Sequence, residues 1–257
     1  MPFIDKETIR KNFSESARYY DLYSDIQDMS ARELILRAGE KEARRILDIG
    51  CGTGSYTKLL REHFPSAGIK AVDISHGMIE LARKKLAHEN VEFIVADGEY
   101  IRPEGRFDLI TSNASLHWFH GLKSALSAYR EFLQDDGLLL FSAFGSRTFM
   151  ELNSSLREFL GRDSAITADG FAKKEEIEDI LRSLFKESSA EEVIYKKQYA
   201  SLLDLLNSIK YTGTKGAGIA KRNFWTPRAM SEIEKIYIKK FKGIEATYQV
   251  FFCKGIK

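Results

Sequence analysis

The segment from Asp48 to Gly54 carries one carboxylate and three glycines at alternate positions, Gly50, Gly52 and Gly54. It follows a short apolar run, where a glycine-rich turn lets the backbone approach a ligand without a clash from Cβ. The dinucleotide fingerprint leaves two residues between its second and third glycines and directs a helix amino terminus at a pyrophosphate. Here the third glycine comes one residue early. The motif therefore favours a ligand bound without a pyrophosphate, with Asp48 organising the loop or contacting a cationic group.

Polar residues also end three later apolar stretches. Asp73 comes about twenty residues after the glycines, the separation at which a carboxylate accepts hydrogen bonds from ribose hydroxyls. Asp97-Gly98 follows the next stretch, and Ser112-Asn113 ends another. An Asp-Gly pair alone is typical of a turn. Because open α/β sheets bind ligands at the carboxyl ends of their strands, the combination predicts a single ligand site at one edge of a sheet.

Strands and helices are expected to alternate through the middle of the chain. Apolar runs predict strands at residues 45–50, 69–73, 91–95, 107–112 and 137–144, with helices at 55–63, 76–88 and 122–133. Ser75 is expected to cap the second helix, and the turn Asp135-Asp136-Gly137 to precede the fifth strand. This alternation predicts an α/β fold with a doubly wound, mostly parallel sheet.

The two flanks have different patterns. Apolar spacings of three and four from residue 8 to 38 predict an N-terminal helical arm. The region 146–190 is mainly helical, 192–199 a strand, 201–242 helices around a glycine-containing loop, and 248–253 a final strand. We interpret residues 1–257 as one domain with an arm (1–44), a ligand-binding core (45–145) and a helical cap with closing strands (146–257).

Composition limits the class of protein. Apolar residues make up 44% and charged residues 30%, and no apolar run approaches the ~18 residues needed to cross a bilayer. The charged N-terminus lacks signal-peptide character, and the two cysteines predict neither a disulfide framework nor a metal site, which favours the cytoplasm. A net charge of +2 argues against nucleic-acid binding. Four basic clusters are surface candidates for an acidic partner: Arg83-Lys84-Lys85, Lys173-Lys174, Lys196-Lys197 and Lys221-Arg222.

With the glycine motif, Asp73 and Asp97 at these spacings, residues 45–144 resemble the class I S-adenosylmethionine-dependent methyltransferases. The resemblance implies a Rossmann-like seven-stranded sheet with an antiparallel last strand, for which residues 248–253 are the expected closing edge. It implies S-adenosyl-L-methionine as cofactor, with Asp73 on the ribose, Asp97 on the adenine and the glycine loop beside the methionine moiety. The expected cofactor-binding residues are Gln27, Asp48, Gly50, Cys51, Gly52, Gly54, Asp73, Ile74, Met78, Asp97, Gly98 and Asn113.

Nearly the whole chain also resembles the malonyl-acyl-carrier-protein O-methyltransferases of biotin synthesis. The positions that match are Phe13, Ala17, Tyr20, Gln27, Ser112-Asn113, Leu116, Trp118, Glu151-Leu152, Ser208-Ile209-Lys210, Gly213 and Thr247-Tyr248. His117, where the family commonly has Gln, and residues 212–216 depart from the family pattern. The resemblance implies a malonyl group on acyl carrier protein, or malonyl-coenzyme A, as acceptor. An acidic carrier would then dock on Lys173-Lys174 or Lys221-Arg222 of the predicted cap.

Methylation of a carboxylate requires the enzyme to position the carboxylate, and removal of a proton from it matters less. A malonyl carboxylate is already ionised at neutral pH, because such acids titrate near ~4, so no general base is required. Lys210 and Tyr20 are the first candidates to hold the carboxylate, followed by His117, Tyr19 and Arg147. Tyr20 is equally explained as a core residue of the arm, and Lys210 as a cation at a helix end.

Other functions are compatible with the same motifs. One alternative is a methyltransferase for another small carboxylic acid such as trans-aconitate. Another is a C-methyltransferase, which would need a base such as His117. A protein that binds the cofactor without turnover is a third. A nucleic-acid methyltransferase is disfavoured by the modest charge and by the absence of an Asn-Pro-Pro-Tyr motif after the fourth strand.

Overall fold

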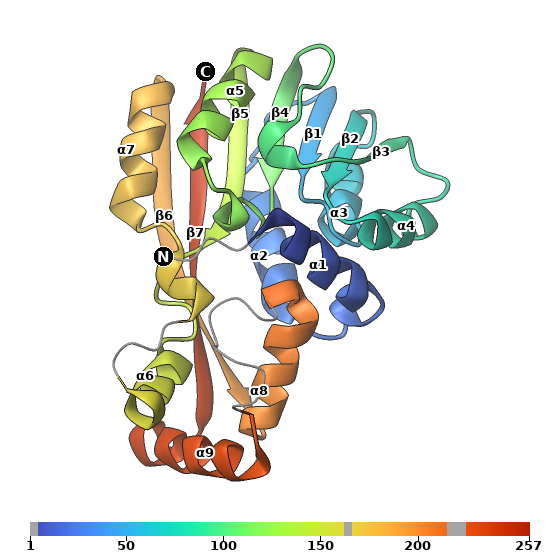
Figure 1. Cartoon of the computed structure of the whole chain (residues 1–257). Helices are drawn as coiled ribbons and strands as arrows, with labels where there is room; N and C mark the ends of the chain where they lie inside the picture. The colour runs from blue at the N-terminus through green and yellow to red at the C-terminus, as the bar shows by residue number, and fades with distance from the viewer. Residues whose placement is uncertain (1–4, 162–165, 215–224) are drawn as a thin grey trace.

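The computed structural model describes residues 5–161, 166–214 and 225–257. Its strands form a seven-stranded sheet in the order β3-β2-β1-β4-β5-β7-β6 (Figure 1). Strands β1 to β5 pair in parallel, whereas β7 runs antiparallel to both β5 and β6. The predicted α/β fold is confirmed. The strands are β1 Arg45–Ile49, β2 Gly68–Asp73, β3 Val91–Val95, β4 Phe107–Ser112, β5 Leu133–Phe144, β6 Glu187–Tyr199 and β7 Ile244–Ile256.

Helices cover both faces of the sheet, which explains why its central strands are apolar throughout. On β1, Ile46 packs in one buried cluster with residues of α2 (Asp25–Leu36) and α3 (Ser55–His63). Its neighbour Leu47 packs in another with residues of α5 (Leu122–Phe132) and α7 (Lys174–Leu184). Successive side chains of a strand point to opposite faces, so neither residue meets water. Helix α4 (His76–Lys85) packs on β2 and β3 and ends before residue 88, the predicted limit.

The position of the last strand differs from the prediction. β7 is antiparallel as expected, but it lies between β5 and β6, so β6 is the edge strand. Nearly every residue of β7 is buried, whereas β6 alternates between exposed and more buried positions. A strand with one face in solvent has alternating polar and apolar residues, as an edge strand commonly does. The expectation that residues 248–253 close the sheet was therefore wrong.

The predicted turn at residues 135–137 is also wrong, because these residues lie within β5. Leu133 stands opposite Phe107, and Leu138 stands opposite Leu109, so β5 carries extra residues at an irregularity in its pairing with β4. Asp136 has a left-handed φ of 60° there. The Asp-Asp-Gly sequence thus indicates a bulge within the strand.

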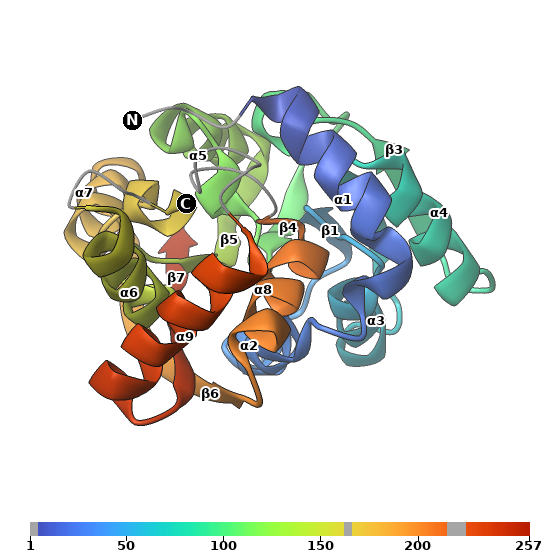
Figure 2. The same cartoon turned by 60° about the horizontal axis from the view of Figure 1, so that its bottom comes forward.

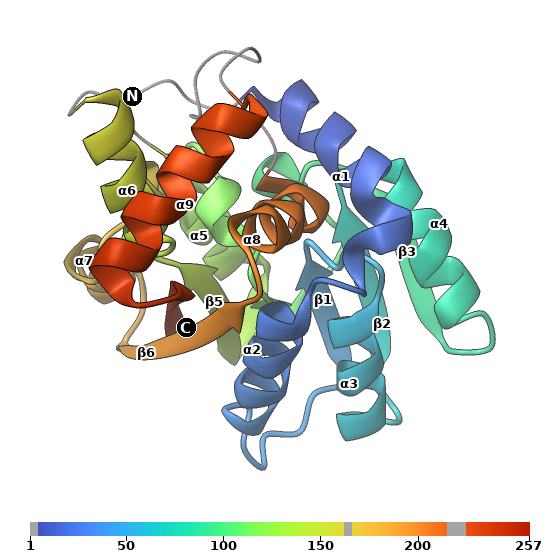
Figure 3. The ribbon, with the colours of Figure 1, turned by 90° about the horizontal axis from the view of Figure 1, so that it is seen from below.

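The remaining helices lie beyond one end of the sheet. They are α1 (Lys6–Tyr20), α6 (Met150–Leu160), α8 (Leu202–Ile209) and α9 (Pro227–Phe241). Helices α6 and α9 lie side by side (Figure 2), and α1 packs against the π-helical turn η4 (Lys210–Thr214) that follows α8. Seen from below, α1, α8 and α9 lie in front of the strands (Figure 3). Helix α7 is not part of this cap, contrary to the prediction, because it packs on β6 and α5.

One buried apolar cluster includes residues of the arm, the sheet and the cap, among them Ile9, Leu140, Leu152 and Leu205. We infer from this shared core that the chain forms a single domain. Within the described ranges, no helix is long and apolar enough to cross a membrane. The same ranges contain no group of three or more His, Cys, Asp or Glu side chains placed to hold a metal ion.

Candidate active site

The glycine loop after β1 has a backbone that only glycine adopts without strain. Gly50, Gly52 and Gly54 have φ values of 71°, 54° and 82°, all in the left-handed region. A Cβ on Gly50 would also overlap the side chain of Ser115. At Gly52, by contrast, no atom lies within 4 Å of the place where a Cβ would stand. The loop therefore presents bare backbone to open space at its middle.

Asp73, at the end of β2, organises this loop. Its Oδ2 accepts a hydrogen bond from the backbone N–H of Gly52 at 2.9 Å, and its Oδ1 accepts one from that of Ser75 at 2.8 Å. Burial raises the pKa of Asp73 to about 6, although these two backbone hydrogen bonds act in the opposite direction. A carboxylate oxygen has more than one lone pair, so Asp73 can still accept hydrogen bonds from ligand hydroxyls.

A cavity of about 70 Å³ lies where the strand-end loops meet. The loop residues Gly50 and Gly52 line it, as do Asp73, Ile74 and Met78 after β2. The predicted residues Asp97, Gly98 and Asn113 line its far side. The structure thus brings together eight of the residues assigned to the cofactor from sequence. Their contacts with a cofactor stay a prediction.

The other assigned cofactor residues lie outside the cavity lining. Asp48 is fully buried, and its Oδ2 accepts a hydrogen bond from Thr57 on α3 at 2.6 Å. Burial raises the pKa of Asp48 to about 7, and among the described residues its Oδ1 has no hydrogen-bond partner. Cys51 is buried, which raises its pKa far above the usual value. Gly54 is the N-cap of α3, and the backbone carbonyl of Gln27 accepts a hydrogen bond from Asn113. None of these four residues lines the cavity.

The side chain of Asn113 is occupied by a polar network behind the cavity. Its Oδ1 accepts hydrogen bonds from the hydroxyls of Ser30 at 2.9 Å and Ser142 at 2.8 Å, and its Nδ2 donates to the backbone carbonyl of Gln27 at 3.0 Å. These bonds connect α2 with the ends of β4 and β5. Through these bonds, Asn113 positions the arm and its own backbone at the cavity.

Two charged residues of the cavity region were missed by the sequence interpretation. Lys6 of α1 lines the cavity, with its Nζ 3.3 Å from Asp97 Oδ1 and 2.7 Å from Glu99 Oε2. Burial alone would raise the pKa of Glu99, but hydrogen bonds from Lys6 and the backbone N–H groups of His120 and Gly121 hold it below its usual value. Lys6 lies in the first turn of a helix, where no motif distinguishes it from a surface lysine.

Tyr20 is the acceptor candidate that the structure brings to the cavity. Burial raises its pKa, and the negative charge of Asp73 adds to this effect, so the hydroxyl remains protonated. Its ring lies 6.3 Å from that of Phe13, which in turn lies edge-on to Trp118 at 6.0 Å. Phe13 and Trp118 also line the cavity. Tyr20 is thus a neutral hydrogen-bond donor beside an aromatic wall.

His117 and Lys210 are not in the cavity lining. His117 packs against the rings of Trp118, Phe144 and Phe171, with centroid distances of 4.6–5.1 Å. Burial lowers the pKa of His117 to about 3, so at neutral pH it offers no positive charge to a carboxylate. The backbone carbonyl of Lys210 accepts a hydrogen bond from Ser16 of α1, whereas its Nζ stands 4.8 Å from the ring centroid of Tyr211 in η4.

The two remaining acceptor candidates are also explained by other contacts. Tyr19 is 49% exposed and packs against Tyr211. Arg147 forms an ion pair with Glu192 at 3.4 Å, and most of its side chain is exposed. Neither lines the cavity.

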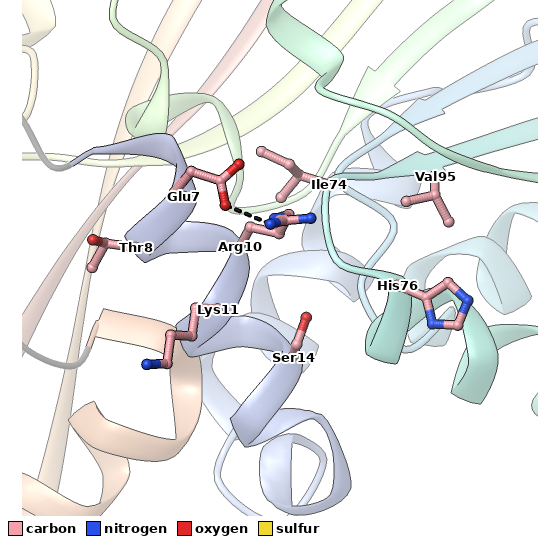
Figure 4. Close-up of a pocket in the computed structure, with 8 residues that line it drawn as sticks. All are labelled: Glu7, Thr8, Arg10, Lys11, Ser14, Ile74, His76 and Val95. Atoms are coloured by element: carbon pink, nitrogen blue, oxygen red, sulfur yellow. Dashed lines mark hydrogen bonds and ion pairs between the residues drawn. The ribbon is translucent and has the colours of Figure 1, made fainter.

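A larger hollow of about 410 Å³ lies on the opposite flank of α1 (Figure 4). Glu7 and Arg10, which form an ion pair, line it together with Lys11 on the α1 side, and Ile74 and Val95 line it on the sheet side. Ile74 lines this groove as well as the small cavity. Helix α1 therefore borders both spaces.

Comparison with known proteins identifies the family. Residues 46–137 match a family model described as a methyltransferase domain. The chain is 34% identical over 255 residues to malonyl-[acyl-carrier protein] O-methyltransferase 2 of Ilyobacter polytropus, covering 98% of this chain and 93% of that protein. The chain belongs to this family of O-methyltransferases. It is an S-adenosylmethionine-dependent enzyme with a Rossmann-like fold.

Solved structures agree on the fold of this methyltransferase. The YcgJ protein of Bacillus subtilis matches with a TM-score of 0.60 at 19% identity, covering 88% of this chain and 97% of that one. Phosphoethanolamine N-methyltransferase 2 of Haemonchus contortus, solved with S-adenosylhomocysteine, matches with a TM-score of 0.57 at 19% identity, covering 88% of this chain and 52% of that one.

Two sequence segments that match the family meet in the cap of the methyltransferase. The carboxylate of Glu151, on α6, accepts hydrogen bonds from the backbone N–H of Thr247 at 2.9 Å and from its hydroxyl at 2.5 Å. Both residues are buried. A buried carboxylate needs such partners, and here they fix α6 to β7.

The basic clusters of the methyltransferase are largely engaged by acidic or carbonyl partners. Lys85 pairs with Asp21, Lys196 with Glu245, and Lys197 with Asp25. Arg83 donates to the backbone carbonyl of Phe93. On α7, Lys174 pairs with Glu178 at 3.4 Å. Lys221 and Arg222 lie outside the described residues. The prediction that Lys173-Lys174 belongs to the cap is wrong, because these residues begin the sheet-flanking helix α7.

Proposed function

We propose that this methyltransferase converts the free carboxylate of a malonyl group carried on acyl carrier protein to its methyl ester, an early reaction of biotin synthesis. The observation that carries the proposal is the near full-length similarity to a relative with that printed name. The similarity includes the arm and the cap, where an acceptor has to be recognised, and not only the cofactor half of the chain.

The cavity residues fit S-adenosylmethionine. The open space beside Gly52 admits a ligand against bare backbone, and the carboxylates of Asp73 and Asp97 can accept hydrogen bonds from ribose and adenine. Pyrophosphate would meet these two carboxylates and be repelled. When bound, S-adenosylmethionine supplies a methyl group on a positively charged sulfur. We assign Asp73 to the ribose, Asp97 to the adenine and the glycine loop to the methionine moiety.

The chain's own groups suit a nucleophile that is already ionised. One carboxylate oxygen forms the bond to the methyl carbon while the carbon–sulfur bond breaks and its electron pair stays on sulfur, so no proton moves. Tyr20 can donate a hydrogen bond to the other oxygen, which places the carboxylate without quenching the attacking atom. The rings of Phe13 and Trp118 exclude water from this side of the cavity.

The geometry gives less support to C-methylation. That reaction needs a base to form a carbanion-like nucleophile. The base considered for that reaction, His117, is enclosed by aromatic rings, and a pKa of about 3 makes it a weak base. We further propose that the enzyme works in the cytoplasm, where its buried, unpaired Cys51 and Cys253 would stay reduced.

The test is methyl ester formation by the purified enzyme on malonyl-acyl carrier protein, malonyl-coenzyme A and trans-aconitate under matched conditions. We expect the highest kcat/KM for the carrier-linked malonyl group. If malonyl-coenzyme A is used equally well, the malonyl assignment stands and the carrier protein is dispensable. Preference for the free acid would contradict the malonyl assignment, and no turnover on any acid would favour the alternative of a non-catalytic cofactor-binding protein.

A further inference from the structure

Helix α1 is bonded to each of the loops that follow β1, β2 and β3. Asp21, the residue that ends the helix, accepts a hydrogen bond from Thr53 of the glycine loop at 2.6 Å. In the middle of the helix, the hydroxyls of Ser14 and Ser75 lie 2.8 Å apart. At the other end, Lys6 lies 3.3 Å from Asp97. These three loops carry the predicted cofactor contacts, so α1 lies across the predicted cofactor site and connects its loops.

The two ends of α1 are held differently. At its C-terminal end the chain continues directly into α2, and Asp21 is also paired with Lys85 at 2.9 Å. At the N-terminal end the Lys6 ammonium bonds both Asp97 and Glu99 and lies 4.8 Å from the ring centroid of Phe119. The Glu99 side chain is only 3% exposed, and that of Lys6 only 20%. Lys6 is therefore the main polar attachment of this end in the described part of the chain.

The cavity beside α1 is small for S-adenosylmethionine in this conformation. The cavity has a volume of about 70 Å³. Pockets that hold small-molecule ligands such as S-adenosylmethionine measure roughly 300–1,000 Å³. The groove on the other flank of α1 adds about 410 Å³. Ile74 borders both spaces, and α1 supplies residues to both from two of its faces. Moving the N-terminal half of α1 would join the groove to the cavity beside Asp97.

We infer that Lys6 is a positioning residue that fastens α1 over the cofactor, and that opening of its bridge to Asp97 and Glu99 sets the rate of cofactor exchange. The helix pivots at its C-terminal end, where Asp21 remains held by Thr53 and Lys85. The adenine end of the ligand enters and leaves through the groove. The inference rests on the cofactor site alone, so it holds whichever acceptor the enzyme uses.

The test is the kinetics of S-adenosylhomocysteine binding to the full chain, followed by stopped-flow fluorescence without acceptor. In Lys6→Met we expect the dissociation rate to rise about five- to tenfold, because a largely desolvated charged hydrogen bond is lost. Added salt should accelerate dissociation from the wild type and have a much weaker effect on the variant. Lys6→Arg should restore slow, salt-sensitive dissociation, which a merely structural role of the lysine stem would not require.

Arg18→Met is the matched control, because Arg18 lies on the same helix, is exposed, and lines neither the cavity nor the groove. It should leave the dissociation rate and its salt dependence unchanged. Unfolding midpoints of both variants, measured without ligand, separate local fastening from loss of fold. Dissociation from Lys6→Met at the wild-type rate and with wild-type salt dependence would overturn the inference. Equal acceleration in Arg18→Met would also overturn it, because the effect would then follow from charge on α1 in general.

Discussion

Replacing Asp73 by alanine tests the cofactor assignment and the architecture of the glycine loop together. The carboxylate accepts hydrogen bonds from the backbone N–H groups of Gly52 and Ser75, and it also lines the cavity. Removing it leaves two backbone donors without their partner, so the free energy of unfolding should fall by about 2–4 kcal/mol. The Asp73→Ala variant should therefore be less stable than a variant that loses a side chain with contacts to the ligand alone.

The same substitution should weaken cofactor binding by about 1–3 kcal/mol, which is roughly a 5- to 150-fold increase in Kd. Isothermal titration calorimetry with S-adenosylhomocysteine measures this change, and urea denaturation measures the stability. The two effects need separation, because a loosened loop would also bind poorly. The chain offers a second carboxylate with the same kind of backbone contacts for this purpose.

Asp108→Ala is that control. Asp108 accepts the backbone N–H groups of Arg44 and Arg45, both at 2.9 Å, at the other end of the sheet. It should lower stability by about 1 kcal/mol, because its site is solvated, and leave the affinity unchanged. An unchanged Kd for a folded Asp73→Ala variant would refute the cofactor assignment. An equal loss of affinity in Asp108→Ala would show that the effect arises from stability alone.

Three further outcomes are expected. Because the pKa of Asp73 is raised to about 6, its carboxylate becomes protonated below that pH and loses acceptor capacity. The affinity for S-adenosylhomocysteine, measured by calorimetry, should therefore fall as the pH drops from 7 to 5. The affinity of Asp73→Asn should depend less on pH over the same range. Tyr20→Phe should lower kcat at saturating cofactor about tenfold, whereas Lys210→Met, which alters a residue outside the cavity lining, should have a smaller effect in the same methyl-transfer assay. Glu151→Gln should lower the free energy of unfolding by about 1–3 kcal/mol in urea titration, because Thr247 loses a charged partner; no change would show that this buried carboxylate is dispensable.

The sequence predicted the part of the site that depends on local backbone requirements. Three left-handed glycines and acidic residues at strand ends follow rules of spacing, so Gly50, Gly52, Asp73 and Asp97 were placed correctly at one edge of the sheet. Sheet order is a long-range property. Residues 187–199 alternate and residues 244–256 do not, yet only the pairing reveals that the final strand is interior.

Residue roles that depend on tertiary partners could not be predicted. A lysine in a first helical turn is usually solvated, and only folding brings Lys6 to Glu99, far along the chain. His117 follows a strand that ends at the cavity, but the rings of Phe144 and Phe171 come from later segments and enclose it. The basic pairs looked available because their acidic partners, such as Glu245 for Lys196, are remote in sequence.

The full-length pairing of β6 with β7 has a consequence for how such enzymes diversify. Tyr199 stands directly opposite Ile244, so the chain leaves the sheet and returns to it at neighbouring points. The chain between these residues, which includes α8 and α9, is one connecting segment, and the pairing of β6 with β7 holds its two ends together. Changes in its length or sequence leave the strand register intact and incur little additional loop-closure cost. The segment between β6 and β7 can therefore change as a unit, while the strand ends and loops that line the cavity stay the same.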